Sequence, residues 1–297
     1  MTFLSRISRR PFQLLAALVV TATALTVPTA AASAAPVSPQ PAVQQLQSAG
    51  LAATISLDSG CSASLARYPS SSDTDRALML TNGHCWEGSV VLPPGVVLVD
   101  LPSIRTGELL DASGQPVATV QADRLLYATM TGTDVALYRL TQTFAQIEDA
   151  TGLSALTIAS SHPADGTAVS IPSGYWKTTY SCAISGFVPT LREAVWTWHD
   201  SIRYQYPDAT CLTVGGTSGS PIVDDTTLQI VGINNTLNEQ GQACTLNNPC
   251  EVDPDGSFTS TPGQNYGQQT YWFTTCLTSA NTLDLDKAGC LLPKPLI

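Results

Sequence analysis

Short hydrophobic segments recur along the chain from Leu51 onward, and polar or turn-forming residues separate them. Each segment is continuously apolar or alternates apolar with polar residues, and Gly, Pro, Asn, Asp or Ser bounds it. This spacing predicts an all-β sandwich or barrel and not an alternation of strands with helices. We expect strands over residues 76–81, 90–101, 116–120, 134–140, 167–171, 178–188, 222–223, 228–233 and 269–273, and short helices near 144–151 and 277–285.

A stretch rich in Gly, Ser, Pro and Asp, at residues 151–166, divides this β-rich region into two nearly equal parts. We therefore expect one β subdomain over residues 51–150 and a second, with its linker, over residues 151–297. A junction between subdomains favours a cleft that excludes water and collects polar groups, so an active site is expected there.

The first 35 residues have the order of an export signal: three arginines, an apolar run, and small residues that end at Ala35. The apolar run is too short for a permanent membrane span, and no later segment is long enough for one. The segment S-R-R-P-F at residues 8–12 resembles a twin-arginine export motif, although arginine pairs also occur in ordinary signals. We expect a secreted protein, with residues 36–50 as a linker or short pro-segment.

Charge narrows the range of partners. Loss of residues 1–35 removes three arginines and no acid, which leaves 10 basic residues against 23 acidic ones and a net charge of −13. Nucleic acids and anionic membranes are therefore not expected as partners.

Eight cysteines in an exported chain indicate disulfides. No metal is expected, because no paired C-x-x-C or H-E-x-x-H spacing is present. The acidic loop with Glu251, Asp253 and Asp255 is either solvated or calcium-binding, but it lacks the ligand series of a calcium loop. Proximity in sequence suggests the pairs Cys182–Cys211, Cys244–Cys250 and Cys276–Cys290.

Three segments supply the residue types of nucleophilic catalysis: T-N-G-H-C with His84, T-D-V-A-L with Asp134, and G-T-S-G-S-P with Ser218. A serine hydroxyl is a poor nucleophile at neutral pH. It needs a histidine to accept its proton and a carboxylate to orient that histidine and stabilise its charge. The chain is thus predicted to be a serine hydrolase.

The order of these residues discriminates between hydrolase folds. All three histidines precede Ser218, whereas α/β-hydrolases run serine, acid, histidine, and Ser220 breaks the G-x-S-x-G pattern. A subtilisin-like order requires a parallel α/β sheet, which the strand pattern does not support.

These segments, together with I-V-G-I-N at residues 230–234, resemble the chymotrypsin-like (trypsin-like) serine proteases, and more closely the bacterial exported branch that includes glutamyl endopeptidases. The resemblance implies two packed, antiparallel, six-stranded β-barrels with catalysis in the crevice, and the expected fold adds a short C-terminal helix. It also implies a Cys61–Cys85 bridge that fixes the histidine loop. The amides of Gly216 and Ser218 would form the oxyanion hole, and no cofactor would be needed.

Alternatives remain at each position. Ser218 is otherwise a turn serine between glycines, and His84 a structural histidine beside a disulfide. Asp134 has rivals in Asp100, Asp111 and Asp123, but only Asp134 opens an apolar strand that would bury its carboxylate. His162 and His199 lack comparable context, and we expect them to be solvated.

Two departures from trypsin bear on activation and specificity. Thr217 stands where trypsin-like zymogens carry the aspartate that pairs with a new N-terminus, so other hydrogen bonds must hold the oxyanion loop. The resemblance places the specificity pocket near Leu212, Thr213, Gly232, Ile233 and Asn234. Leu212 replaces the cation-binding aspartate and Asn234 the histidine of glutamyl endopeptidases, which favours an uncharged apolar or small residue before the cleaved bond.

Trp196, Trp198, Tyr204 and Tyr206 alternate, which predicts either barrel packing or an exposed aromatic platform for a polymeric substrate. Together these features predict a monomeric, secreted serine endopeptidase that acts on proteins or peptides. Two rivals remain: a non-catalytic binding protein with the protease fold, and an esterase with little proteolytic activity.

Overall fold

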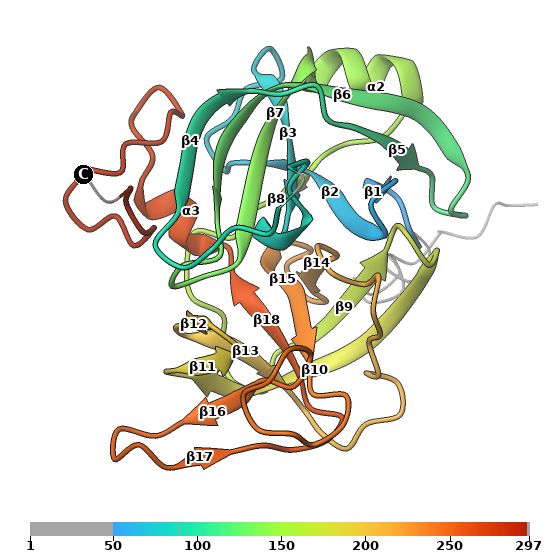
Figure 1. The fold of residues 1–297 in the computed structure, drawn as a ribbon. Coiled ribbons are helices and arrows are strands. Elements are labelled where there is room, and N and C mark those ends of the chain that lie inside the picture. Colours follow the sequence, from blue (N-terminus) through green and yellow to red (C-terminus); the bar gives the residue numbers. More distant parts are fainter. Residues whose placement is uncertain (1–49, 89, 296–297) are drawn as a thin grey trace, which may run out of the picture. The chain divides into compact units, whose positions relative to one another are not determined.

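Two closed barrels of six strands each make up the computed structural model, which describes residues 50–88 and 90–295 (Figure 1). The expected export signal and, apart from Gly50, the expected pro-segment lie outside the described residues. Within the described range, no helix combines the length and apolar character needed to cross a membrane.

In the first barrel the strands follow the order β1, β5, β6, β7, β3, β2, and the antiparallel pairing of β1 with β2 closes the ring. An additional strand, β4, pairs with β6. The bounds are β1 Thr54–Leu57, β2 Cys61–Arg67, β3 Arg76–Thr81, β4 Val97–Pro102, β5 Thr106–Leu110, β6 Pro116–Thr129 and β7 Val135–Thr143.

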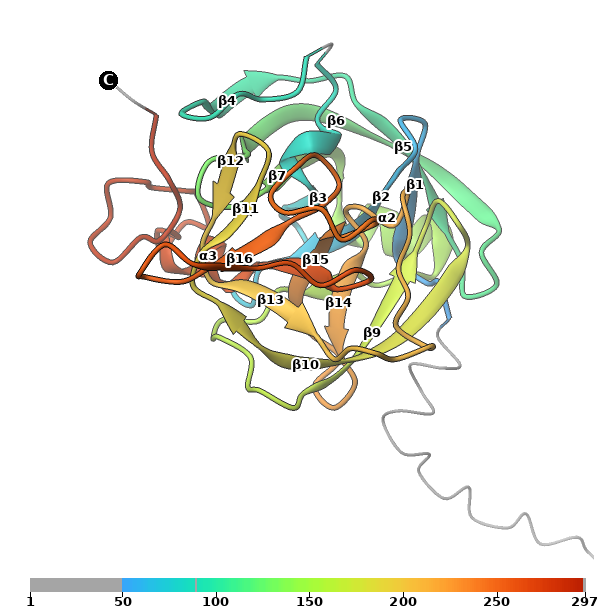
Figure 2. The same ribbon diagram turned by 60° about the horizontal axis from the view of Figure 1, so that its bottom comes forward.

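The second barrel follows the order β10, β13, β18, β15, β14, β9 and is likewise antiparallel (Figure 2). Beside it lies a four-stranded sheet in the order β12, β11, β16, β17. The bounds are β9 Ala168–Ser173, β10 Thr178–Val188, β11 Leu191–Glu193, β12 Trp196–Trp198, β13 Ser201–Tyr204, β14 Pro221–Asp224, β15 Ile230–Leu237, β16 Cys250–Val252, β17 Phe258–Thr259 and β18 Asn265–Gln269.

The segment between the barrels is bonded to both of them. A short strand within it, β8 (Leu156–Thr157), pairs in parallel with β2. The Ile158 amide then donates to Arg67 in the first barrel, and the Ala159 amide donates to Ile230 in the second. The predicted linker is thus fixed by backbone hydrogen bonds at this point.

Helix α2 occupies Phe144–Thr151, the range expected from the sequence. Its start is set by a capping box, in which the Thr143 hydroxyl accepts from the Gln146 amide at 3.2 Å and the Gln146 side chain accepts from the Thr143 amide at 2.9 Å. Gly152 ends it with φ 72°, a left-handed conformation that glycine adopts without steric cost.

The C-terminal helix lies earlier than expected. α3 occupies Tyr271–Thr275, so the strand predicted over 269–273 ends at Gln269 and the helix predicted near 277–285 is absent from that described segment. Burial explains the difference, because Phe273 is fully buried and packs edge-on against Tyr127 of the first barrel. Consecutive aromatic residues favour a strand locally, and tertiary packing overrides that preference here.

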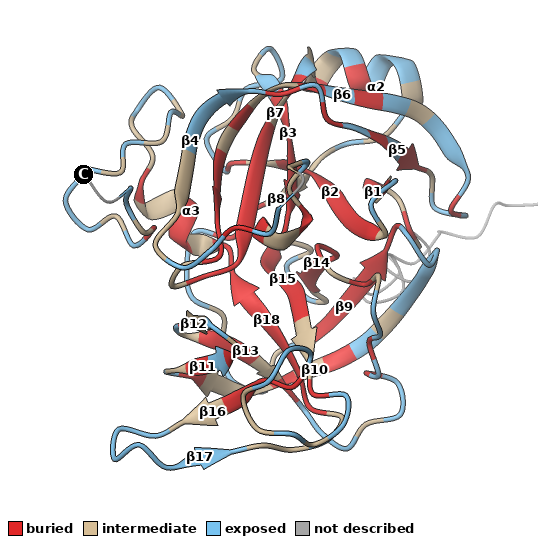
Figure 3. Cartoon of the chain, viewed as in Figure 1, coloured by how far each residue is buried: buried red, intermediate tan, exposed pale blue. Residues whose placement is uncertain are grey.

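Buried positions, red in Figure 3, follow the strands of both barrels, and the buried apolar residues form two clusters, the larger of which extends from the first barrel to Ile230 and Ile233 of β15. Ile55, Leu80 and Leu137 lie in the core of the first barrel, and Ile171 and Ile202 lie in that of the second. The eight cysteines form Cys61–Cys85, Cys182–Cys211, Cys244–Cys250 and Cys276–Cys290, the four pairs expected from the sequence.

Replacement of Leu137 by alanine should lower the free energy of unfolding by about 2–5 kcal/mol, because it leaves a cavity in the first barrel. Thr141→Ala, at an exposed position of the same strand, should change it by less than about 0.5 kcal/mol. Urea unfolding of the oxidised protein measures both values. Equal effects of the two substitutions would contradict this assignment of the core.

Candidate active site

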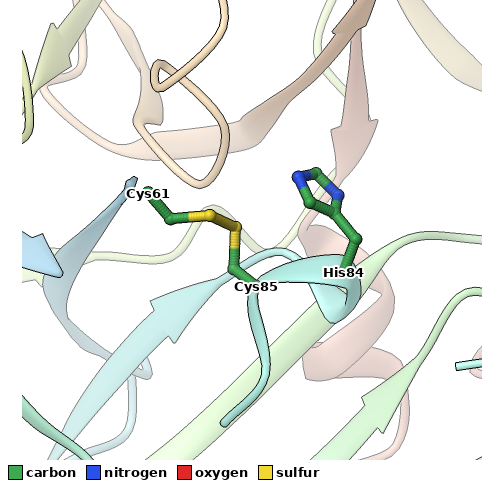
Figure 4. A group of neighbouring side chains, drawn as sticks. All are labelled: Cys61, His84 and Cys85. Atoms are coloured by element: carbon green, nitrogen blue, oxygen red, sulfur yellow. A yellow bond between two sulfur atoms is a disulfide. The ribbon is translucent and has the colours of Figure 1, made fainter. Parts of the chain in front are cut away.

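His84 is held in place by a covalent bridge at the next residue. It lies in the 3-10 turn η1 (Gly83–Cys85) just after β3, and Cys85 is bonded to Cys61 at the start of β2. Figure 4 shows the imidazole beside this disulfide. The two sulfurs and the imidazole lie close enough to suggest a metal site, but sulfurs bonded to each other are not thiolate ligands.

Asp134 accepts two hydrogen bonds from His84. Its Oδ2 lies 2.7 Å from Nδ1 of the imidazole, and its Oδ1 accepts the His84 backbone amide at 2.9 Å. The Asn82 side chain donates to the Asp134 carbonyl at 2.9 Å. Because the carboxylate only accepts, it holds the proton on Nδ1 and leaves Nε2 free to accept another.

Close packing makes glycine necessary at position 83. A Cβ atom there would lie 2.0 Å from the Thr129 carbonyl oxygen and 3.0 Å from Oδ1 of Asp134. The G in T-N-G-H-C therefore lets the histidine turn approach the buried acid.

The charges around His84 favour its protonated form. Burial, the largest single effect, lowers the pKa of His84, but the charge and hydrogen bond of Asp134 and the charge of Glu193 together raise it above its ordinary value. Burial raises the pKa of Glu193, whose carboxylate accepts hydrogen bonds from Thr236 and from the Asn247 amide.

Ser218 lies in the loop before β14, and this loop is attached to the first barrel. The Ser62 amide of β2 donates to the Ser218 carbonyl at 2.8 Å. Gly219 has φ 80°, and a Cβ atom there would lie 2.1 Å from the Ser62 carbonyl oxygen. Glycine after the serine is therefore required both by its backbone conformation and by the close approach of β2.

One cleft of about 250 Å³ is lined by His84, Asp134 and Ser218. The Ser218 hydroxyl donates to the backbone carbonyl of Asn235 at 3.3 Å, and among the described residues no hydrogen bond joins it to His84. The structure thus brings all three residues to one cleft, with the histidine–aspartate pair formed and the serine hydroxyl turned toward β15.

The loop before Ser218 is held without the aspartate of trypsin-like zymogens. The Thr217 hydroxyl donates to the Val214 carbonyl at 2.6 Å and accepts from the Asn234 side chain at 2.9 Å. Across residues 50–88 and 90–295, the amides of Gly216 and Ser218 donate to no protein acceptor. Ser218 lines the cleft, and Gly216 is not among its lining residues.

Of the five predicted pocket residues, only Asn234 lines the cleft. Leu212 is 47% exposed and lies outside the lining, and Thr213 is buried with its hydroxyl 2.6 Å from Asn265. Gly232 and Ile233 are buried within β15. The resemblance alone did not show which of these residues face the cleft, because adjacent β15 residues such as Ile233 and Asn234 point to opposite faces of the sheet.

The cleft wall comes largely from residues that sequence motifs do not mark. Trp196 and Trp198 of β12 line it, and so does the neighbouring Glu193. Trp198 is buried in the apolar core, as the packing prediction expects, and Trp196 is half-buried against it. Both lie in the four-stranded sheet, where their indoles donate to Met130 and Leu92. The only signal in the sequence was the aromatic alternation, since an isolated glutamate carries none.

The remaining candidates lie elsewhere. Asp100 pairs with Arg124 and Asp123 with Arg139, while Asp111 closes a turn with Ser113. His162 and His199 are exposed, as expected.

Comparison with known proteins supports the family resemblance that the sequence motifs indicated. The family model "Trypsin-like peptidase domain" matches residues 70–233, more than half of the chain. No curated protein matches.

Three solved structures illustrate the similarity. Nocardiopsis protease is 16% identical, with 74% of this chain and 92% of that one covered and a TM-score of 0.40. Cellulomonas bogoriensis chymotrypsin is 18% identical, with 75% and 91% covered and a TM-score of 0.39. The MamO protease domain from Magnetospirillum magneticum is 12% identical, with 78% and 100% covered and a TM-score of 0.47.

Asp134→Asn should lower the pKa of His84, because it removes the negative charge that favours the imidazolium. The wild-type midpoint should lie above the ordinary histidine value, and the variant midpoint should lie below the wild-type one. NMR titration of the imidazole resonances measures both, with His84→Gln to assign the signal. Asp123→Asn, whose partner is Arg139, is the matched control, and an equal shift in that variant would contradict the pairing.

Proposed function

Because the chain belongs to the trypsin-like peptidase family, we propose that it is a secreted serine endopeptidase in which Ser218, His84 and Asp134 act as a catalytic triad. The observation that carries the proposal is the 2.7 Å contact between His84 Nδ1 and the buried Asp134, in a cleft that Ser218 also lines. The family implies protein or peptide substrates. The four disulfides fit an extracellular protein.

In the proposed reaction, Ser218 leaves the Asn235 carbonyl by rotation about its Cα–Cβ bond and donates instead to His84 Nε2. Its oxygen attacks the peptide carbonyl as Nε2 takes the proton, and the C–N bond breaks as His84 returns that proton to the leaving amine. Water then repeats both steps on the acyl-enzyme and regenerates the hydroxyl. Asp134 stabilises the imidazolium throughout and keeps the proton on Nδ1.

Charge that develops on the carbonyl oxygen is proposed to be bound by the amides of Gly216 and Ser218, which have no protein acceptor among the described residues. Loss of one such donor typically costs about 2.7–4 kcal/mol of transition-state stabilisation. Since Thr217 already anchors this loop to Val214 and Asn234, we propose that activity does not depend on the insertion of a new N-terminus.

The proposed substrate carries an uncharged apolar or small residue before the cleaved bond. Val214 and Leu237 line the cleft together with Ser218. The carboxylate of Glu193, which also lines the cleft, is held by hydrogen bonds from the Thr236 hydroxyl and the Asn247 amide.

A non-catalytic binding protein is the second candidate, and the orientation of the Ser218 hydroxyl toward Asn235 favours it. An esterase with little proteolytic activity is separated from the main proposal by comparing an ester with a protein substrate. The buried Asp134 against His84 favours acyl transfer over a binding role, and an esterase would use the same acyl-transfer chemistry.

A fluorophosphonate probe should label the oxidised wild-type protein and fail to label Ser218→Ala, because only an activated serine displaces the fluoride. Ser220→Ala is the matched control in the same loop, since the buried Ser220 hydroxyl has no hydrogen-bond partner among the described residues. Intact-mass spectrometry detects the adduct, and a folded wild-type protein that takes up no probe would favour the binding protein.

Asp134→Asn should lower kcat on a peptide substrate by about 10⁴-fold.

A further inference from the structure

The hairpin turn between β9 and β10 lies against the loop that carries Ser218. Two aromatic residues of this turn, Tyr175 and Trp176, pack edge to face with ring centroids 5.1 Å apart. The Trp176 indole donates a 2.7 Å hydrogen bond to the Gly215 carbonyl. This contact joins two segments that are 39 residues apart in sequence.

The accepting carbonyl belongs to the Gly215–Gly216 peptide unit, which also carries the Gly216 N–H. The Gly215 C=O and the Gly216 N–H are the two ends of one trans peptide, so they point in opposite directions. When Trp176 fixes the carbonyl on its own side, the Gly216 N–H must face away from the indole. That N–H is one of the two proposed oxyanion donors, and it has no protein acceptor among the described residues.

The contact with Tyr175 and Trp176 requires glycine at position 216. Its φ is 93°, and a Cβ atom there would lie 2.7 Å from the Trp176 indole nitrogen and 2.8 Å from Cδ1 of Tyr175. The aromatic pair therefore packs directly on the Gly216 backbone. A residue with a side chain at this position would both strain the backbone and displace the aromatic rings.

The next carbonyl along the loop is also held. The Gly216 C=O accepts from the hydroxyl of Ser62 at 3.2 Å, and Ser62 is fully buried. The same hydroxyl accepts the Tyr175 amide at 3.1 Å and lies 3.0 Å from the hydroxyl of Ser173. Hydrogen bonds thus fix the carbonyls on both sides of the Gly216 α-carbon, and the β9–β10 turn contributes to each.

The turn itself is fixed on the first barrel. A Cβ atom on Gly174 would lie 2.4 Å from the Ile55 carbonyl oxygen, so the turn approaches β1 as closely as glycine allows. The indole of Trp176 is consequently attached to a fixed turn, although the residue is 49% exposed.

We propose that Trp176 is a positioning residue that orients the Gly215–Gly216 peptide, so that the Gly216 amide faces the substrate carbonyl oxygen. This inference rests on the proposed serine endopeptidase function. Two adjacent glycines before Thr217 leave the backbone with wide conformational freedom, and the aspartate ion pair that fixes this loop in trypsin is missing. Trp176 supplies the constraint from outside the loop.

The test is Trp176→Phe, which keeps an aromatic ring on the turn and removes the N–H donor. Because the Gly216 amide stabilises charge that exists only in the transition state, kcat should fall by about tenfold while KM stays within about twofold. Affinity for a peptide boronic acid, which mimics the tetrahedral adduct, should fall by a similar factor. Affinity for an uncleaved product peptide should stay the same.

Tyr175→Phe is the matched control, because its hydroxyl donates no hydrogen bond in the described structure and its ring is retained. It should leave all three measurements unchanged. Unchanged kcat in Trp176→Phe would overturn the inference. A rise in KM with kcat unchanged would overturn it as well, since the indole would then be a substrate contact.

Equal losses in boronate and product-peptide affinity would also overturn it, because they would indicate general distortion of the cleft. Failure of the proposed function is distinguished by the wild-type protein itself, which would then neither turn over the substrate nor react with the fluorophosphonate.

Discussion

The site depends on two adjacent residues at the start of β2. Cys61 is bonded to Cys85 and so fixes the turn that carries His84. Ser62 donates its amide to the Ser218 carbonyl and its hydroxyl to the Gly216 carbonyl. One dipeptide of the first barrel thus holds both the histidine loop of its own barrel and the serine loop of the other. Displacement of β2 would therefore open the first barrel and separate the proposed base from the proposed nucleophile.

Electrostatics imposes a second constraint. Asp134 is buried. The free-energy cost of removing its carboxylate from water is offset by hydrogen bonds to both its oxygens and by the neighbouring imidazole. Glu193 adds a second buried carboxylate to the cleft, and its charge also favours protonated His84. The charges of both acids favour an imidazolium, which is the state that proton transfer from a serine would generate.

Much of this arrangement could be predicted from local sequence. The limits of β3, β10 and α2 matched, because turn residues and a capping box punctuate the chain there. The residues predicted from the motifs, His84, Asp134 and Ser218, line one cleft. The glycines in these motifs occupy positions where the backbone packs too closely for a side chain. Four disulfide pairs followed from short separations and, for Cys61–Cys85, from family resemblance.

Contacts between distant segments were beyond such reasoning. The helix at Tyr271–Thr275 forms because Phe273 packs against Tyr127, which no window around residue 273 contains. The family resemblance assigned Leu212 and Thr213 to a pocket, but the orientation of each side chain depends on the barrel wall. Glu193 and Trp176 carry no motif, and only the fold reveals what lies beside them.

The connection between the barrels has a mechanical consequence. Over residues 156–159 the chain pairs with β2 of the first barrel and then hydrogen-bonds to Ile230 of the second, so consecutive residues bind it to both barrels. A flexible linker would let each barrel unfold independently. Because this linker is hydrogen-bonded to both barrels, unfolding of one barrel destabilises the other. The two halves should therefore unfold together, as a single cooperative unit.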